Sequence, residues 1–317
     1  MDACRAIKRI GWAILIAAGM TAAADGQAAN VRVRCGGGGE DAFPSISAAL
    51  AHLDARGTNT IAVYGACQEN LSITDFNQLT LNANAGASIS DASGGTKNVI
   101  VITSSQTVNF NGFTIDGALL CQISSFCGFS GNTFQNARGA GGLGDGVFIR
   151  AASHASFSGD KIVNNGRFGM TVTGGSFAEA TGITVRGNAS AGMFLVVGPT
   201  VLLNNPTIAN NGYHGIWVRD HGTLFITDSE VTGNGGSGIS LESGSEALLY
   251  ATLTGNVITG NGNYGVLVAD LSLVDGWTTG NTVSGNSGQP DVQCVGKSSA
   301  AIGLPLKAGT ISATCGP

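Results

Sequence analysis

Hydrophobic residues recur along this chain with a spacing of about 23 residues. Each recurrence begins with a glycine, and the next and third-next residues are apolar. The glycines lie 23, 23, 23, 23 and 27 residues apart, in the segments Gly146-Val-Phe-Ile, Gly169-Met-Thr-Val, Gly192-Met-Phe-Leu, Gly215-Ile-Trp-Val, Gly238-Ile-Ser-Leu and Gly265-Val-Leu-Val. In a second register, an asparagine follows an aliphatic residue by three positions, at Asn165, Asn188, Asn211, Asn234, Asn261 and Asn286. Two registers that agree over six periods establish an internal repeat.

Each period contains short alternating apolar segments separated by Gly, Asn, Ser or Thr, a pattern typical of strands and turns. A unit of this size cannot bury its own apolar face, so successive units must stack. The sequence therefore predicts an all-β fold, a single-stranded right-handed parallel β-helix (solenoid) with an N-terminal capping helix. Successive turns are then about 4.8 Å apart, and the asparagines form a stacked amide ladder.

The segments outside the regular repeat predict four parts of the chain. Residues 1–24 are expected to be a signal peptide, 25–60 an N-terminal cap, 61–290 the β-helix and 291–317 a C-terminal cap. Within the N-terminal cap, residues 31–34 are predicted as a strand and residues 43–56 as a helix that covers the open end of the stack.

The first 24 residues combine three basic side chains with an apolar run from Trp12 to Ala24 that is too short to span a bilayer. We therefore expect a secreted or periplasmic bacterial protein, cleaved after Ala24 or Ala28 and without a membrane span. The remaining chain has 12 Lys and Arg against 19 Asp and Glu, a net charge of −7. This charge argues against nucleic acid as a partner.

Six cysteines remain after the signal peptide, and an even number in an oxidising compartment predicts disulfides. Six cysteines allow 15 connectivities. Proximity in the sequence favours Cys35 with Cys67, Cys121 with Cys127, and Cys294 with Cys315. A zinc site is the rejected alternative, because no CxxC pair occurs and the four histidines are scattered.

The Asn-x-Gly-x-x-Gly-apolar turns resemble the repeats of the pectin-lyase-like superfamily over residues 60–293. The segment Gly36-Gly-Gly-Gly-Glu-Asp-Ala-Phe-Pro-Ser-Ile-Ser-Ala-Ala-Leu, followed by Ile61-Ala-Val-Tyr, is similar to the beginning of pectin methylesterases. The resemblance implies a parallel β-helix and a polysaccharide as partner. The active-site motifs of polygalacturonases, methylesterases and alginate epimerases do not match, and fold alone does not define function.

The repeat predicts which side chains point outward, because the first and third apolar residues of each strand face the core. Phe194 and Trp217 are then vertical neighbours on one outer face, with Arg219 over Glu242 beside them. An exposed aromatic pair next to charged groups can stack on the apolar face of a sugar ring. The predicted substrate-binding set is Phe194, Trp217, Tyr213, His214, Arg219 and Glu242.

Catalytic candidates are few. Asp220, His221 and Arg219 are the candidates for proton transfer on the same turn, although Arg219 and Glu242 also fit a surface ion pair. Asp220 could pair with Asp270 or Glu242 at the carboxylate separation that glycoside hydrolases use. No carboxylate cluster for calcium is evident in the sequence, so no metal or other cofactor is predicted.

Three functions remain open from the sequence. The favoured hypothesis is an exported β-helix that binds or presents a surface to polysaccharide without turnover. The second is a lyase, hydrolase or C5-epimerase that acts on an acidic polysaccharide across the turn of Trp217. The third is an adhesin or a structural protein. The oligomeric state is not predicted.

Overall fold

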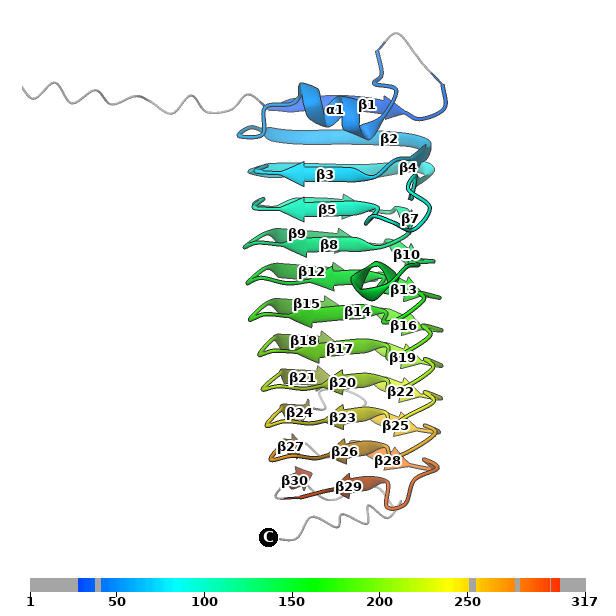
Figure 1. The fold of residues 1–317 in the computed structure, drawn as a ribbon, viewed down its shortest axis with the longest axis vertical. Coiled ribbons are helices and arrows are strands. Elements are labelled where there is room, and N and C mark those ends of the chain that lie inside the picture. Colours follow the sequence, from blue (N-terminus) through cyan, green and yellow to red (C-terminus); the bar gives the residue numbers. More distant parts are fainter. Residues whose placement is uncertain (1–27, 38–40, 251–254, 277–279, 297, 303–317) are drawn as a thin grey trace, which may run out of the picture.

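The computed structural model describes residues 28–37, 41–250, 255–276, 280–296 and 298–302. These residues form one long stack of parallel strands, each paired with the equivalent strand one turn away (Figure 1). The predicted all-β parallel β-helix is confirmed. The predicted signal peptide and Cys315 lie outside the described residues.

One face of the stack is a ten-stranded sheet, which faces the viewer in Figure 1. Its strands follow the Gly-apolar-x-apolar register of the sequence from Gly146 onward. They are β3 (Leu71–Thr74), β5 (Ile100–Thr103), β8 (Leu119–Gln122), β11 (Val147–Ile149), β14 (Met170–Thr173), β17 (Met193–Val196), β20 (Ile216–Val218), β23 (Ile239–Leu241), β26 (Val266–Val268) and β29 (Val292–Cys294).

The remaining strands form a second sheet that bends into two ladders. The first ladder contains β1 (Ala29–Arg34), β2 (Thr58–Gln68), β4 (Gln78–Ser90), β6 (Val108–Asn111), β9 (Phe126–Ser130), β12 (His154–Ser158), β15 (Phe177–Thr181), β18 (Thr200–Asn204), β21 (Thr223–Thr227), β24 (Glu246–Tyr250), β27 (Leu273–Gly276) and β30 (Ser299–Ile302). The second ladder continues from the ends of β2 and β4 through β7 (Thr114–Asp116), β10 (Thr133–Gln135), β13 (Lys161–Val163), β16 (Thr184–Arg186), β19 (Thr207–Ala209), β22 (Glu230–Thr232), β25 (Val257–Thr259) and β28 (Thr282–Ser284).

The core runs through the centre of the stack. In each repeat strand of the ten-stranded sheet, the first and third apolar residues are fully buried, as at Val147 and Ile149 or Ile216 and Val218. The residue between them faces outward, as predicted. Because no repeat buries its own apolar surface, each rung depends on its neighbours.

The predicted amide ladder lies at the corner between β13 and β14 and at the equivalent corners of later turns. Asn188 Nδ2 donates to Asn211 Oδ1 at 2.9 Å, and Asn211 Nδ2 donates to Asn234 Oδ1 at the same distance. The same bond joins Asn165 to Asn188, Asn234 to Asn261 and Asn261 to Asn286. At its end, Asn286 donates to the carboxylate of Asp291.

The N-terminal helix is shorter than predicted. It is α1 (Ile46–His52), which lies at the N-terminal end of the stack and buries Ile46, Ala49 and Leu50. Ser45 has an extended backbone, and its side chain accepts the Ala48 N–H as an N-cap. The carboxylate of Glu69 accepts two further N–H groups of the first turn. Leu53 has left the helical conformation, with ψ 145°, which ends the helix before Arg56.

Disulfides join Cys35 to Cys67 and Cys121 to Cys127, as predicted. The third predicted pair includes Cys315 and stays a prediction. A short 3₁₀ helix, η1 (Gly141–Gly144), precedes β11. At the C-terminal end, β29 and β30 still pair with the ladders, within the segment expected to be the C-terminal cap.

Candidate functional site: an aromatic strip on the ten-stranded sheet

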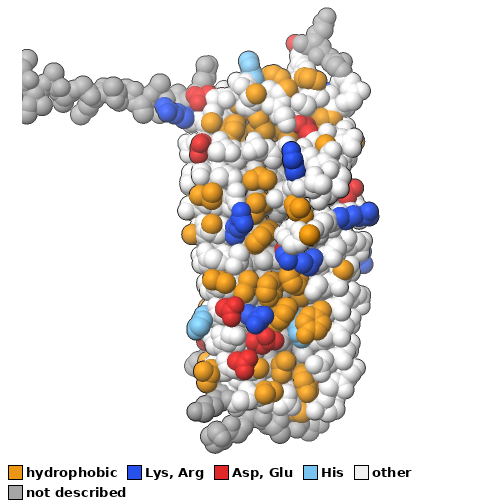
Figure 2. Space-filling model, in the orientation of Figure 1, with side chains coloured by type: hydrophobic (Ala, Val, Ile, Leu, Met, Phe, Trp, Pro, Cys, Tyr) orange, Lys and Arg blue, Asp and Glu red, His pale blue; other side chains and the backbone are white. Residues whose placement is uncertain are grey.

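The outer surface of the ten-stranded sheet carries a strip of aromatic side chains. The strands align Thr171 with Phe194, and Phe194 with Trp217. Figure 2 shows this face, with hydrophobic side chains down its middle and charged side chains gathered beside them over its lower half. We define the aromatic strip as Phe168, Phe194, Trp217 and Tyr213.

Ring contacts make the strip continuous along the axis of the stack. The ring centroids of Phe168 and Phe194 are 4.7 Å apart and stacked, and those of Phe194 and Trp217 are 4.9 Å apart and tilted by 42°. The Tyr213 ring stands edge-on to Trp217 at 5.6 Å and is 45% exposed. The first two separations follow from the strand spacing of about 4.8 Å, because Phe168, Phe194 and Trp217 lie on successive rungs, whereas Tyr213 shares the rung of Trp217.

Glu242 and Arg219 fix the Trp217 ring. The indole N–H of Trp217 donates to Glu242 Oε1 at 3.0 Å, and Ser240 Oγ lies 3.3 Å from the same oxygen. Arg219 Nε lies 3.3 Å from Glu242 Oε2, and Arg219 Cζ lies 5.2 Å from the centre of the Trp217 ring. The predicted ion pair of Arg219 and Glu242 is therefore present. The Glu242 carboxylate therefore accepts from Trp217 and Ser240 and is paired with Arg219, which holds it against the indole ring.

His214 is a buried neutral histidine beneath the strip. Its ring lies 3.8 Å from the Tyr213 ring and 5.6 Å from the Trp217 ring, between centroids. Burial lowers the pKa of His214 to about 4. The Ser237 N–H donates to Nδ1 at 2.9 Å, so in the neutral ring the proton resides on Nε2. The sequence placed His214 in the binding set, and the structure brings its neutral ring beside Trp217 with Nδ1 already occupied by a backbone N–H.

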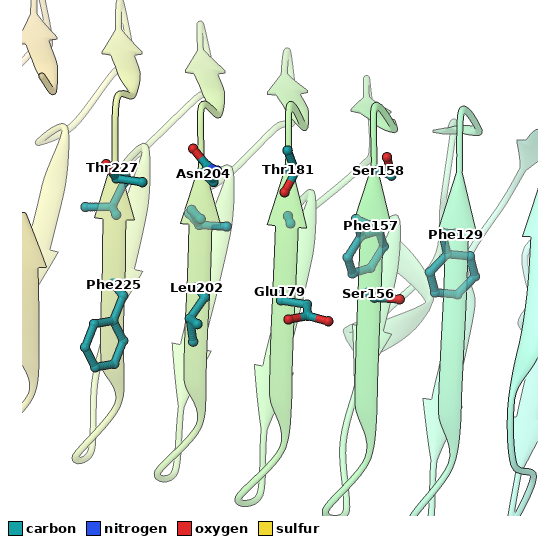
Figure 3. Close-up of a pocket in the computed structure, with 13 residues that line it drawn as sticks. Phe129, Ser156, Phe157, Ser158, Glu179, Thr181, Leu202, Asn204, Phe225 and Thr227 are labelled. Atoms are coloured by element: carbon teal, nitrogen blue, oxygen red, sulfur yellow. The ribbon is translucent and has the colours of Figure 1, made fainter. Parts of the chain in front are cut away.

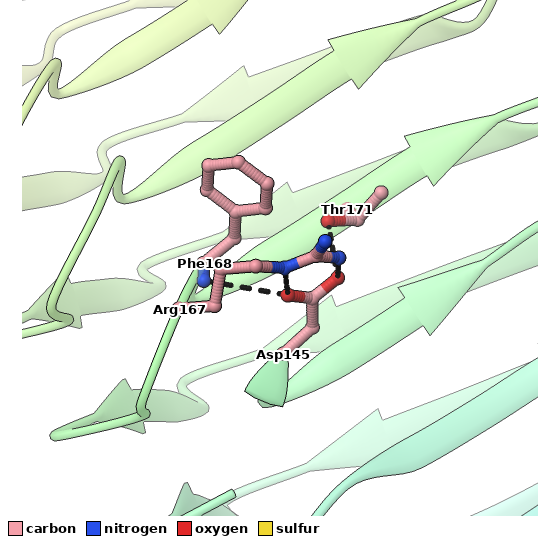
Figure 4. Close-up of polar contacts among 4 residues, drawn as sticks. All are labelled: Asp145, Arg167, Phe168 and Thr171. Atoms are coloured by element: carbon pink, nitrogen blue, oxygen red, sulfur yellow. Dashed lines mark hydrogen bonds and ion pairs between the residues drawn. The ribbon is translucent and has the colours of Figure 1, made fainter. Parts of the chain in front are cut away.

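An ion pair at the N-terminal end of the strip was not predicted. Asp145 is fully buried, and Arg167 binds it through two hydrogen bonds of 2.6 and 2.5 Å (Figure 4). Thr171 Oγ1 donates to the same carboxylate at 2.7 Å. Arg167 also covers the Phe168 ring, with Cζ 4.7 Å from its centre. This network fixes the ring that begins the strip.

A signal for two of the missed residues was present in the repeat. Asp145 and Phe168 directly precede the glycine that opens a period, as the predicted His214 does. Apart from Tyr213 and His214, the predicted site residues come after that glycine. The position before it lies at the corner, and there its side chain turns onto the same face.

Asp220 and His221 lie at a different corner from the strip. Both have left-handed backbones, with φ of 51° and 64°, in the turn that follows β20. Among the described residues, neither side chain makes a hydrogen bond or ion pair with Trp217, Arg219 or Glu242. Ser243 occupies the rung between Asp220 and Asp270, since His221 N donates to Ser243 O and Gly244 N to Asp270 O. The structure therefore does not join Asp220 to a second carboxylate.

The described ranges contain one candidate group of metal ligands. It consists of Cys35, Cys67 and Glu69. The two cysteines form a disulfide, and Glu69 binds the first turn of α1. This group does not fit a metal ion. Across the same residues, no helix has the length and apolar character needed to cross a bilayer.

The fold and this outer face define a right-handed parallel β-helix with one aromatic face. The sequence matches the family described as the right handed beta helix region over residues 117–288, more than half of the chain, and the protein belongs to that family. No curated protein sequence matches the chain.

Two solved structures share the fold over most of the chain. Pectate lyase Pel9A has a TM-score of 0.60 and 14% sequence identity, over 92% of this chain and 82% of that one. The A-module of the Azotobacter vinelandii mannuronan C-5 epimerase AlgE4 has a TM-score of 0.54 and 16% identity, over 91% of each chain. At these identities the likeness shows the fold alone.

Proposed function

We propose that this protein binds a polysaccharide chain along the aromatic strip and does so without turnover. The observation that carries the proposal is the pair of partly exposed rings of Phe194 and Trp217 on successive rungs, with the buried Phe168 ring stacked against Phe194. Sugar rings present apolar faces that stack on aromatic side chains, while their hydroxyls reach polar groups at the edge. The two structural neighbours, named as a pectate lyase and a mannuronan epimerase, support polysaccharide as the class of ligand.

The state of the polar groups supports binding over catalysis. Glu242 is held by Trp217 and Arg219, and Asp145 is closed off by Arg167 and Thr171. His214 has its Nδ1 occupied by a backbone donor. A general base needs a free lone pair within reach of a substrate proton. The carboxylates of Glu242 and Asp145 instead accept from the side chains that hold the rings, and only the Nε2–H of neutral His214 is suited to donate a hydrogen bond.

The test is binding to a panel of polymers by affinity electrophoresis, using polygalacturonate, alginate and a neutral β-glucan. Trp217→Ala is expected to weaken binding roughly tenfold or more, because a central stacked ring contributes about 2 kcal/mol. Trp217→Phe keeps a ring but removes the donor to Glu242, so it separates stacking from the hydrogen bond. Leu267→Ala, on the same sheet two strands away, is the matched control. Absence of binding to every polymer contradicts the proposal.

A lyase or epimerase acting on an acidic polysaccharide is the second candidate. It is favoured by the neighbours' names and by the neutral His214 and exposed Tyr213 beside Trp217. A lyase would release unsaturated uronate products, detected by their ultraviolet absorbance. An epimerase would invert C5, detected by NMR of the treated polymer. Either activity, if lost in Tyr213→Phe, would replace the binding proposal.

An oxidising location accompanies the proposal. Disulfides persist in periplasmic and extracellular proteins and are rare in the cytosol. The two disulfides of the described chain, Cys35 to Cys67 and Cys121 to Cys127, support export to such a compartment. Mass spectrometry of the mature protein would test the predicted cleavage after Ala24 or Ala28.

A further inference from the structure

A groove lies on the first ladder of the second sheet, away from the aromatic strip. It crosses β12, β15, β18 and β21 and has a volume of about 490 Å³ (Figure 3). Ligand sites commonly occupy roughly 300–1,000 Å³. We call this cavity the side groove.

The side groove is built from two parallel columns of side chains. The polar column contains Ser158, Thr181, Asn204 and Thr227, aligned rung by rung. The second column, two positions earlier on each strand, contains Ser156, Glu179, Leu202 and Phe225. Because alternate residues of a strand face outward, the backbone between the columns forms the floor.

The polar column offers unused hydrogen-bonding groups. Within the described structure, the side chains of Ser158, Thr181 and Asn204 make no hydrogen bond. Thr227 Oγ1 is buried and also lacks a partner. A row of hydroxyl and amide groups with the strand spacing of about 4.8 Å can bind successive hydroxyls of an extended chain.

The second column changes along the groove from polar to apolar. Leu202 is 37% exposed and lies next to Phe225, whose ring faces the groove. Glu179 is the charged residue among those that line the groove, and no Lys or Arg lines it. His154 Nε2 lies 3.6 Å from Glu179 Oε1, at the end nearest β12. An anionic polymer would meet a carboxylate here without a lining cation.

The floor of the groove also disfavours an extended peptide. Peptides that add to a sheet pair with the free N–H and C=O groups of an edge strand. β12, β15, β18 and β21 each pair with strands on both sides, so their backbone groups are already used. Only side chains face the groove.

We propose that the side groove binds an extended, uncharged, hydroxyl-rich glycan chain. Phe225 and Leu202 contact the apolar faces of its sugar rings. Ser158, Thr181 and Asn204 bind its hydroxyls, and Glu179 accepts from a further hydroxyl. This site is separate from the aromatic strip and does not depend on the function proposed for that strip.

The experiment is calorimetric titration of the mature protein with three neutral hexasaccharides, cellohexaose, laminarihexaose and mannohexaose. Phe225→Ala is expected to weaken binding of at least one of them roughly tenfold, because it removes a stacking ring. Asn204→Ala removes an exposed amide and is expected to weaken it by about two- to tenfold. Thermal unfolding of each variant shows whether the fold is retained, and Asn204→Ala keeps the test valid if Phe225→Ala unfolds.

Leu267→Ala is the control, because Leu267 lies on the ten-stranded sheet and outside the lining of the side groove. It is expected to leave neutral-hexasaccharide binding within twofold of the unmodified protein. No saturable binding of any of the three sugars at millimolar concentration overturns the proposal. So does binding that Trp217→Ala abolishes and Asn204→Ala leaves unchanged, since the sugar would then lie on the aromatic strip.

Discussion

The amide ladder makes a quantitative prediction at Asn211. Its side chain makes four hydrogen bonds inside the corner. Oδ1 accepts from Asn188 N at 3.1 Å and from Asn188 Nδ2 at 2.9 Å, while Nδ2 donates to Val185 O at 3.2 Å and to Asn234 Oδ1 at 2.9 Å. Asn188, Asn211 and Asn234 are 1–2% exposed, so water cannot replace these partners.

Asn211→Ala leaves two buried N–H groups of Asn188 without acceptors, one on the backbone and one on the side chain. A buried donor without a partner costs about 1–3 kcal/mol, so the variant should lose about 4 kcal/mol. Asn211→Asp restores the acceptor but turns an oxygen toward Val185 O and Asn234 Oδ1, so it should be at least as destabilising. Asp291→Asn is the control, because Asp291 accepts from Asn286 at the end of the ladder.

The assay is native-state hydrogen exchange, since a stack of repeats can open locally. The Asn188 amide should lose about 4 kcal/mol of protection in Asn211→Ala, and amides near β5 should change little. Urea unfolding gives the global effect. A loss of protection below about 1 kcal/mol at Asn188 would refute the view that the ladder stabilises the corner through hydrogen bonds.

The remaining predictions concern buried ionisable groups. Arg167→Leu leaves the buried Asp145 carboxylate without its cation and should cost about 3–5 kcal/mol in urea unfolding, whereas a cost below 1 kcal/mol would contradict this ion-pair argument. Burial raises the pKa of Asp160 to about 6 from 3.8, so this group stabilises the folded protein as pH falls from 6 toward 4. Asp160→Asn should therefore lose up to about 3 kcal/mol relative to the unmodified protein between pH 7 and pH 4, measured by urea unfolding at each pH. His214 acts in the opposite direction, because its stabilisation is complete above pH 6.5 and is lost as pH falls toward 4. A stability difference that does not change with pH would rule out the assignment to Asp160.

The sequence predicted the architecture well because each repeat contacts only its neighbours along the stack, so the period alone specifies which positions are aligned. A fixed period determines which residues face the core, so the pairing of Phe194 with Trp217 and the ladder through Asn211 could be derived without coordinates. The ion pair of Arg219 and Glu242 followed from the same alignment.

Contacts at the corners could not be derived in this way. Asp145 and Arg167 come from adjacent turns but from different positions within the period, so no single register aligns them. The side groove was not predicted, although Leu202 and Phe225 obey the same period, because the Gly-apolar-x-apolar register identifies outward positions only on the ten-stranded sheet. The helix was predicted too long at both ends. Its start at Ile46 depends on Glu69, a tertiary contact 23 residues away, and its end at His52 follows from the extended backbone of Leu53.

The amide ladder has a direction, and this direction limits how the molecule can change in length. Each asparagine both accepts and donates, so one more 23-residue turn copied between Asn188 and Asn211 would find complete partners above and below. Asp291 accepts but its carboxylate has nothing to donate, so it closes the series. Growth by duplication is thus permitted in the middle of the stack and blocked at Asp291, which makes the interior turns the place where new binding surface can be added.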